Sequence, residues 1–354
     1  MSERLPRVLI LHAYSADNAG DGLLVRETLA LIQDAVGEAD ITLLASRPDS
    51  FAELVPNVHP TVPTIRGWHS DTRAILRQID NYDLVVGVGG GYLRSGTLIE
   101  ALKAGLVMGP QLRAAARSSA PTVYLPQSIG PARFGTRAWV RSQLEKIDLV
   151  MVRDDRSLAE MSGRSIVRMP DLATAAIAEG RPDRTDVDPT PVVSIRAVHG
   201  KVNPDIYVLA SRLGTYDGYI QSTIGGNDDR PASATLDPRL VISRSELMTP
   251  GARPRVVVAV RLHAALMALA AGHYVVHLAY ERKGFGAFGD LGIDPWVHTV
   301  NGFDVETVFD QTIKLLEDGD ARADYNRRLA ESSGALADAR GRISRELATR
   351  IRRD

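Results

Sequence analysis

The chain of 354 residues contains no cysteine, which excludes disulfide bonds and thiolate chemistry and is typical of a cytoplasmic enzyme. It also lacks any apolar run of the roughly 18 uncharged residues that a membrane-spanning helix needs. The formal net charge is only −1, so no bulk electrostatic field draws the chain to nucleic acid or to anionic lipid. The amino-terminal segment holds one short apolar run, which predicts a first strand and not a signal peptide.

Several sequence signatures of cofactor and metal sites are missing as well. The chain has no G-x-x-x-x-G-K-[ST] phosphate loop, no G-x-S-x-G nucleophile motif and no H-E-x-x-H metal motif. The glycine run Gly87–Gly91 resembles the dinucleotide fingerprint only loosely, because Tyr92 occupies the place of its third glycine. We therefore expect neither a metal site nor a bound cofactor.

Apolar runs alternate with helical patterns through the first half of the chain, which predicts parallel βαβ units. The alternation stops at residues 179–191, where three prolines and many charges indicate a linker, and it resumes at Val192. We expect two doubly wound, Rossmann-like α/β domains that face each other across a cleft. The predicted domains are residues 1–180 and 191–304, followed by C-terminal helices at 305–354. The terminal helix, after about Ala321, is expected to pack back toward the first domain.

Residues 256–292 form the most informative stretch, because two strand-like runs flank a helical one. Arg261 and Lys283 each follow a strand, at the edge where open α/β sheets bind ligands. These cations suit a phosphate or carboxylate, and His263 titrates near neutrality. Arg196 ends the first strand of the second domain, so it could form an anion clamp with Arg261. Ordinary surface cations, and a histidine that caps or packs at a strand–helix junction, remain alternatives.

Polar loops follow the strands of the first half. Asp21, in the loop Asn18–Asp21, could cap a helix or act as a base. The motif Pro126–Pro131 predicts a rigid loop that presents polar groups to sugar hydroxyls, with a plain turn as the alternative. Arg153 could pair with an acid or reach the cleft. The neighbouring acids Asp228 and Asp229 are expected to be solvated.

Read together, these elements resemble the polysaccharide pyruvyl transferase family in order and spacing, over residues 8 to about 295. The matching elements are N-x-G-D at Asn18–Asp21, the glycines Gly89–Gly91, PQSIGP at Pro126–Pro131, RDxxS at Arg153–Ser157, SIR at Ser194–Arg196, RLHA at Arg261–Ala264 and YxxK at Tyr280–Lys283.

The resemblance implies a fold like that of the two-domain GT-B glycosyltransferases and an enzyme that uses phosphoenolpyruvate as donor. The three-carbon unit would become a ketal on two hydroxyls of a hexose, with release of phosphate. His263 is then the candidate general acid, and Asp21 the candidate base. The implied donor-binding residues are Arg196, Arg261, Leu262 and Lys283, and the implied acceptor-binding residues are Asn18, Gly90, Gly91, Tyr92, Gln127 and Ser128.

The acceptor would be a hexose in an exopolysaccharide, a cell-wall glycan or a lipid-linked precursor. We therefore expect a cytoplasmic protein, held peripherally at the inner face of the membrane where the acceptor is lipid-linked. The competing hypothesis is a GT-B glycosyltransferase that uses a nucleotide sugar, since it would share the fold and need cations near a diphosphate. A non-catalytic scaffold is a third class, which the intact polar loops disfavour.

Overall fold

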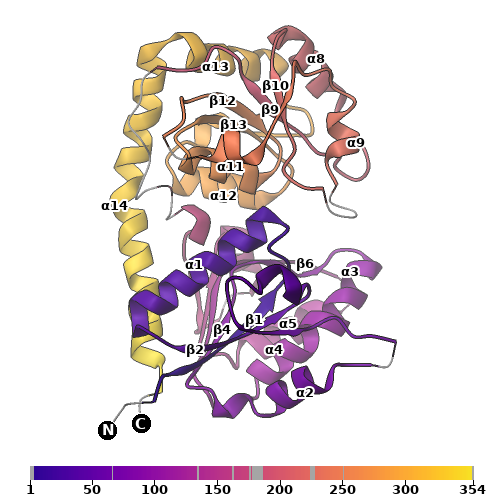
Figure 1. Ribbon diagram of the computed structural model, residues 1–354, viewed down its shortest axis with the longest axis vertical. Coiled ribbons are helices and arrows are strands. Elements are labelled where there is room, and N and C mark those ends of the chain that lie inside the picture. Colours follow the sequence, from indigo (N-terminus) through magenta and orange to yellow (C-terminus); the bar gives the residue numbers. More distant parts are fainter. Residues whose placement is uncertain are drawn as a thin grey trace. The chain divides into compact units, whose positions relative to one another are not determined.

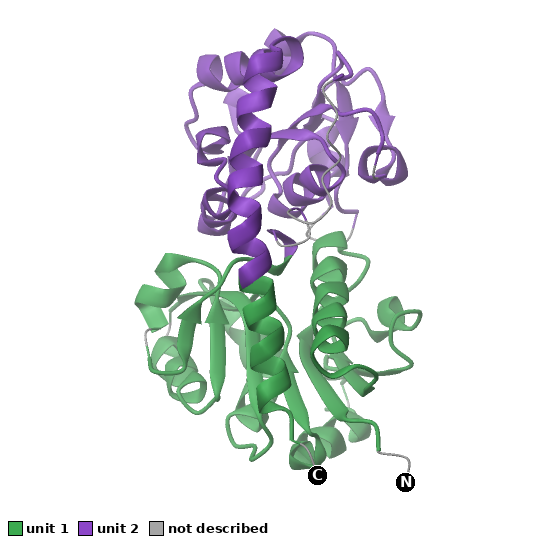
Figure 2. Cartoon of the chain, turned by 90° about the vertical axis from the view of Figure 1, so that its left-hand side faces the viewer, with its two compact units in different colours: residues 1–172, 339–354 green, residues 173–338 purple. Residues whose placement is uncertain are grey.

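The computed structural model describes residues 4–65, 67–133, 135–161, 163–174, 177, 186–223, 228–249 and 251–352. The chain divides into two α/β units, as predicted. Residues 1–172 and 339–354 form unit 1, and residues 173–338 form unit 2 (Figure 2). The linker predicted at residues 179–191 lies largely outside the described residues.

Unit 1 alternates strands and helices in the order expected of βαβ units (Figure 1). Its strands are β1 (Arg7–Ala13), β2 (Asp40–Ala45), β3 (Asn57–Pro60), β4 (Leu84–Gly87), β5 (Gly90–Ser95), β6 (Thr122–Ala132), β7 (Leu149–Val152) and β8 (Ile166–Arg168). Its helical elements are α1 (Ala19–Val36), η1 (Pro48–Phe51), α2 (Ser70–Arg77), η2 (Ile79–Asn81), α3 (Leu98–Lys103), η3 (Ala104–Met108), α4 (Gly109–Ala115), α5 (Thr136–Leu144) and α6 (Asp155–Met161).

The sheet of unit 1 is parallel, with the order β3-β2-β1-β4-β6-β7-β8, and β5 pairs with β6 beside this path. The strands β1, β4 and β7 are mostly apolar because both faces of the sheet are covered. In β1, Val8 and Ile10 pack into one hydrophobic cluster, whereas Leu9 and Leu11 pack into another. This arrangement sets the carboxyl ends of the strands, and the motifs that follow them, along one edge.

The structure corrects the prediction of a loop at Pro126–Pro131, because these residues continue β6. The short strand β5 pairs parallel with this half of β6 and aligns Gly90 with Gln127 and Leu93 with Ile129. The backbone thus gains sheet partners that the sequence pattern of prolines did not indicate. The peptide bond Gly130–Pro131 is cis.

Unit 2 repeats the parallel architecture, with the strand order β11-β10-β9-β12-β13-β14. Its strands are β9 (Val192–Ser194), β10 (Asp217–Tyr219), β11 (Val241–Ile242), β12 (Val256–Ala259), β13 (Tyr274–Ala279) and β14 (Val297–Thr299). Its helical elements are α8 (Pro204–Leu213), α9 (Arg230–Ser233), α10 (Arg244–Met248), α11 (Leu262–Ala270), α12 (Arg282–Asp290), η5 (Asp294–Trp296), α13 (Val305–Glu317) and α14 (Gly319–Arg350), of which the last also enters unit 1.

Helix α14 returns to unit 1, as expected from the sequence. Ile343, Leu347 and Ile351 lie in the same hydrophobic cluster as β1. Arg340 reinforces the contact, since it forms ion pairs with Glu27 and Asp34 of α1. Within the described part of the chain, no helix is long and apolar enough to cross a membrane.

Candidate active site

The carboxyl ends of three central strands in unit 2 bring the predicted donor-binding residues to one edge. The register aligns Ala259 of β12 with Ser194 of β9 and with His277 of β13. Arg196 follows Ser194 by two residues, and Arg261 follows Ala259 by two residues. The arrangement is the one in which open α/β sheets collect ligand-binding groups.

Arg261 is held by a carboxylate that the sequence analysis assigned to solvent. Its Nε and Nη2 atoms donate to the two carboxylate oxygens of Asp229, at 2.5 and 2.6 Å. The side chains of Arg261 and Asp229 are only 11% and 2% exposed. The prediction that Asp229 is solvated is therefore wrong, whereas Asp228 pairs with the exposed Arg230. A bidentate pair fixes the plane of the Arg261 guanidinium group.

Burial raises the pKa of Asp229, and its hydrogen bond and charge interaction with Arg261 oppose this rise. Arg196 adds a further lowering influence, which shows that both predicted clamp arginines act on the same carboxylate. Arg196 is itself positioned by Tyr280, whose hydroxyl accepts a bond of 2.8 Å from Nη1 and whose ring lies 4.8 Å beneath the guanidinium carbon. The SIR, RLHA and YxxK motifs thus meet around two arginines.

The remaining donor-side candidates lie at the starts of two helices. Leu262 and His263 are the first residues of α11, and Arg261 occupies the N-cap position without making a side-chain cap bond. Leu262 is buried, whereas His263 is partly exposed. Lys283 lies in the first turn of α12 and pairs with Glu281 at 2.8 Å. Both helix starts present backbone N–H groups of the kind that bind anions.

Buried polar groups without a hydrogen-bond partner among the described residues gather near the same strand ends. They are Ser194 Oγ, Tyr219 OH, Gln221 Oε1 and Ser222 Oγ. Tyr219 ends β10 and lies beside Ser194 on the neighbouring β9, by extension of the register of these two strands. Burial raises the pKa of Tyr219 to about 12, so its hydroxyl is a donor at neutral pH. Such groups are unusual in a folded protein and indicate unused capacity to bind a polar ligand.

In unit 1 the loop Asn18–Asp21 forms the start of α1. The cap is Asn18, which accepts a hydrogen bond from the N–H of Gly20 and donates from Nδ2 to Asp21 at 2.7 Å. Asp21 therefore does not take the capping role that was one alternative. Its carboxylate is partly exposed in the first helical turn.

The β6 motif contributes one polar side chain without a partner and one that is engaged. Both amide atoms of Gln127 are buried and have no hydrogen-bond partner among the described residues. Ser128 accepts a bond of 3.0 Å from Arg153. Arg153 also pairs with Asp171, and both side chains are 2% exposed, so this arginine takes the acid-pairing alternative. Within this motif, the side-chain amide of Gln127 has the largest unused capacity for hydrogen bonds among the described residues.

Tyr92 lies in a buried aromatic and imidazole cluster beside the glycine run. Its ring stacks on His12 at a centroid distance of 4.4 Å, and His12 Nε2 lies 2.8 Å from the Tyr124 hydroxyl. The Tyr92 hydroxyl and His12 Nδ1 are buried without a partner among the described residues. Burial lowers the pKa of His12 to about 3, so this histidine is neutral and unsuited to act as a general acid near neutral pH.

Glycine is required at two positions of the neighbouring turn. A side chain at Gly89 would place its first carbon 2.8 Å from the carbonyl oxygen of Pro126. Gly90 has a φ of 148°, which favours glycine, and Gly91 is partly exposed. These glycines are therefore needed mainly for the packing of β5 on β6. They also bring the backbone of Gly91 close to the surface.

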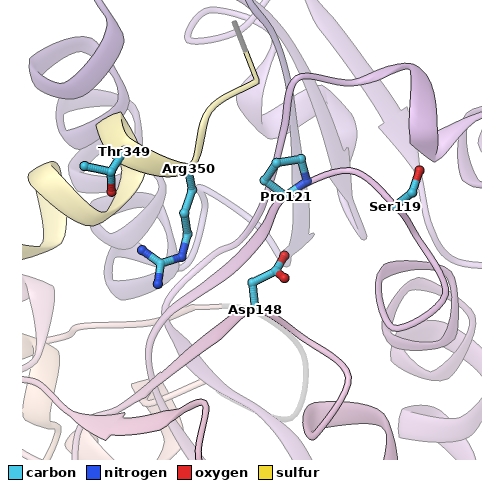
Figure 3. A pocket seen from close by; sticks show the side chains of 5 residues that line it. All are labelled: Ser119, Pro121, Asp148, Thr349 and Arg350. Carbon is cyan, nitrogen blue, oxygen red and sulfur yellow. The ribbon is translucent and has the colours of Figure 1, made fainter.

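A pocket of about 570 Å³ in unit 1 is lined by none of these residues. Pro121 and Asp148 precede β6 and β7, so the pocket is at the amino edge of the sheet (Figure 3). Its other lining residues are Ser119, Thr349 and Arg350. No group of three or more histidine, aspartate or glutamate side chains is placed to hold a metal ion in the part of the chain that the structure describes.

Comparison with known proteins identifies the family. The model of the polysaccharide pyruvyl transferase family matches residues 18–282. The chain belongs to this family. A polysaccharide pyruvyl transferase is a transferase enzyme, and the matched range contains Asn18, Arg196, Arg261 and His263. No curated protein sequence matches the chain.

Solved structures similar to this polysaccharide pyruvyl transferase have the GT-B fold of two Rossmann-like domains. Trehalose-6-phosphate synthase OtsA matches at 11% identity and a TM-score of 0.55, covering 97% of this chain and 98% of its own. Spinosyn forosaminyltransferase SpnP matches at 11% and 0.51, covering 99% and 98%. UDP-GlcNAc 2-epimerase from Methanocaldococcus jannaschii matches at 9% and 0.51, covering 89% and 93%. At such identities the likeness establishes the fold alone.

Proposed function

We propose that this enzyme transfers the enolpyruvyl unit of phosphoenolpyruvate to two hydroxyls of one hexose, forming a pyruvate ketal and releasing phosphate. The hexose belongs to an exopolysaccharide, a cell-wall glycan or its lipid-linked precursor. The family match supports transfer of a pyruvyl group to a polysaccharide. The donor, the ketal product and the roles of the residues are the proposed part.

The observation that carries the proposal is the group of charges at the carboxyl edge of the unit 2 sheet. Arg196 and Arg261 act on one buried aspartate, Asp229, which leaves one net positive charge. Phosphoenolpyruvate carries a carboxylate and a phosphate, and planar guanidinium groups bind both kinds of anion. The hydroxyls of Ser194 and Tyr219 provide further donors near the same strand ends.

The proposed reaction begins with transfer of a proton from His263 to the methylene carbon of the donor. The double bond is consumed, and an oxocarbenium forms at the carbon that bears the phosphate. A sugar hydroxyl attacks this carbon and loses its proton to Asp21, and the carbon–oxygen bond to phosphate then breaks. The second hydroxyl adds to the same carbon and closes the ketal ring, and its proton leaves with phosphate or to solvent. The reaction requires no cofactor beyond the donor.

The acceptor is proposed to lie against the loops of unit 1 at Asn18, Gly90–Tyr92 and Gln127–Ser128. Short polar side chains and an aromatic ring are typical of sugar-binding sites. The amide of Gln127 supports this proposal, because it has hydrogen-bonding capacity that no described residue uses. Tyr92 would contact the sugar with the part of its partly exposed side chain that does not stack on His12.

The test is to incubate the protein with phosphoenolpyruvate and a panel of hexosides, and to measure released phosphate and the mass of each product. A mass gain of one pyruvate ketal is expected for at least one hexoside. In heavy water, deuterium should enter the product methyl group. His263→Gln should lose at least about 10²-fold in turnover while donor binding and the fold stay close to wild type. Normal turnover of this variant would assign the proton transfer to another acid.

The same assay separates the competing function. A glycosyltransferase would release a nucleoside diphosphate from a nucleotide sugar and no phosphate from phosphoenolpyruvate. The GT-B fold is compatible with both reactions. Activity with a nucleotide sugar alone would replace the proposal with this alternative.

A further inference from the structure

Three leucines form an exposed stripe on the helical segment that follows the candidate acceptor loop of unit 1. Leu98, Leu102 and Leu106 are 61%, 58% and 56% exposed. They recur every four residues along α3 and the π-helix η3, so they share one side of the helix. Figure 1 shows α3 at the outer edge of unit 1. We call these three residues the leucine face.

Residues outside the leucine face cap this helical segment and anchor it. Thr97 and Glu100 form a capping box, in which the Thr97 side chain accepts from the N–H of Glu100 and the Glu100 carboxylate accepts from that of Thr97. Farther along, Gln111 and Leu112 are fully buried in α4 and hold the segment to the body of unit 1. Single exposed leucines are ordinary, but three neighbouring ones indicate an interaction surface.

The charge of the surrounding segment favours an anionic partner. Residues 94–117 contain four basic residues and one acidic residue, a net charge of +3 within a chain whose net charge is −1. A second copy of the chain would bring the same positive charge against this face. An anionic lipid surface offers the opposite charge together with an apolar interior, which leucines beside basic residues enter. The basic residues are Arg94, Lys103, Arg113 and Arg117, and the acidic one is Glu100.

The leucine face also lies close to the proposed acceptor site along the chain. Strand β5 carries Gly90–Tyr92 and ends at Ser95, three residues before Leu98. The six steps along the chain from Tyr92 to Leu98 span at most about 22 Å even when fully extended. A sugar carried on a membrane lipid could therefore reach the acceptor loop while the leucine face rests on the bilayer.

We propose that the leucine face docks this enzyme on an anionic membrane, where the acceptor is presented on a lipid. The leucines enter the interface between head groups and acyl chains, and Lys103 contacts the anionic head groups. This inference rests on the proposed function, because it specifies a lipid-linked acceptor for the same site.

The test measures cosedimentation of the full chain with vesicles of phosphatidylglycerol and phosphatidylcholine in equal parts, and with vesicles of phosphatidylcholine alone. Wild type should bind the anionic vesicles more tightly. Replacing all three leucines by glutamine should weaken binding about a hundredfold or more. Lys103→Glu should weaken it about fivefold or more, and this loss should shrink at high salt. The matched control is Val208→Gln, which alters a 51% exposed apolar residue on α8 of unit 2 and should bind as wild type does.

Circular dichroism and thermal unfolding identify any variant that fails to fold, and Lys103→Glu, which leaves the leucines in place, provides the second test. Wild type that does not bind anionic vesicles would overturn the docking proposal, even where a soluble hexoside is converted to its ketal. If the protein binds anionic vesicles but forms no ketal on any hexoside, the proposed function is wrong. Leucine-dependent dimerisation without vesicle binding would assign the face to a second copy and also overturn the proposal.

Discussion

Replacing Asp229 by asparagine should destabilise unit 2, because the amide offers an N–H₂ group in place of one of the two oxygens that accept from Arg261. Both side chains are almost fully buried, so solvent does not screen the pair. A buried donor left without its acceptor costs about 1–3 kcal/mol. Asparagine keeps the shape of the side chain, so the loss reports the hydrogen bonds with Arg261 and not a cavity.

The direction of the Asp229 pKa allows a second, sharper expectation. Burial raises the pKa, so the ionised carboxylate is disfavoured in the folded state, and the folded state gains relative stability as pH falls through that pKa. The attraction between Asp229 and Arg261 therefore mainly offsets the cost of removing their charges from water, and the pair adds little to the free energy of unfolding. The double variant Asp229→Asn with Arg261→Gln buries no charge. It should recover most of the loss and give a coupling energy of about 1–3 kcal/mol in the double-mutant cycle.

The measurement is urea unfolding followed by the fluorescence of Trp296, which is 9% exposed in unit 2. Trp68 and Trp139 lie in unit 1 and should be replaced by phenylalanine in every variant, so that the signal reports unit 2 alone. The reasoning is refuted when Asp229→Asn changes the free energy of unfolding by less than about 1 kcal/mol and the cycle shows no coupling.

Three further predictions concern donor, acceptor and pH. Arg261→Lys keeps the charge but loses the planar fork, so calorimetry should show donor binding weakened about ten- to a hundredfold; unchanged affinity would place the donor elsewhere. Tyr92→Ala should raise the KM of the acceptor in steady-state kinetics and leave that of the donor nearly unchanged, and the reverse pattern would relocate the acceptor. Because burial lowers the pKa of His12 to about 3, the unfolded chain alone takes up this proton below pH 6.5, so wild-type stability should fall by about 2 kcal/mol between pH 7 and pH 5. His12→Asn suits the φ of 70° and should remove this part of the fall in urea unfolding, whereas an equal fall in both proteins would show that His12 does not titrate as inferred.

Much of the fold could be predicted because buried parallel strands leave a strong apolar pattern. The first strand, predicted from the short apolar run of the amino-terminal segment, is β1 (Arg7–Ala13) in the structure. The extension of β6 through Pro126–Pro131 could not be predicted, since prolines and a glycine usually end a strand and its partner β5 is short and glycine-rich. Sheet pairing here overrides the local preference.

The candidate site shows the same division between local and distant signals. Arg196 and Arg261 could be selected because each directly follows an apolar run, and that position is visible in the sequence. Asp229 could not, because it pairs with Arg261 across 32 residues and lies in a stretch whose composition indicates a solvated loop. Its partner is determined by tertiary packing. Each acidic residue near a strand end could still be considered as an ion-pair partner for an arginine predicted at the same edge of the sheet.

The return of α14 to unit 1 has a consequence for how the chain folds as it is synthesised. Ile343, Leu347 and Ile351 complete a hydrophobic cluster whose other members include Val8 and Ile10 of the first strand. The ribosome must therefore finish all of unit 2 before the earliest-made strand receives its last apolar neighbours. Unit 1 begins to fold first and is completed last. Until its C-terminal residues are made, part of its core is exposed to solvent or to chaperones. Loss of these last turns of helix should harm the part of the protein that is made first.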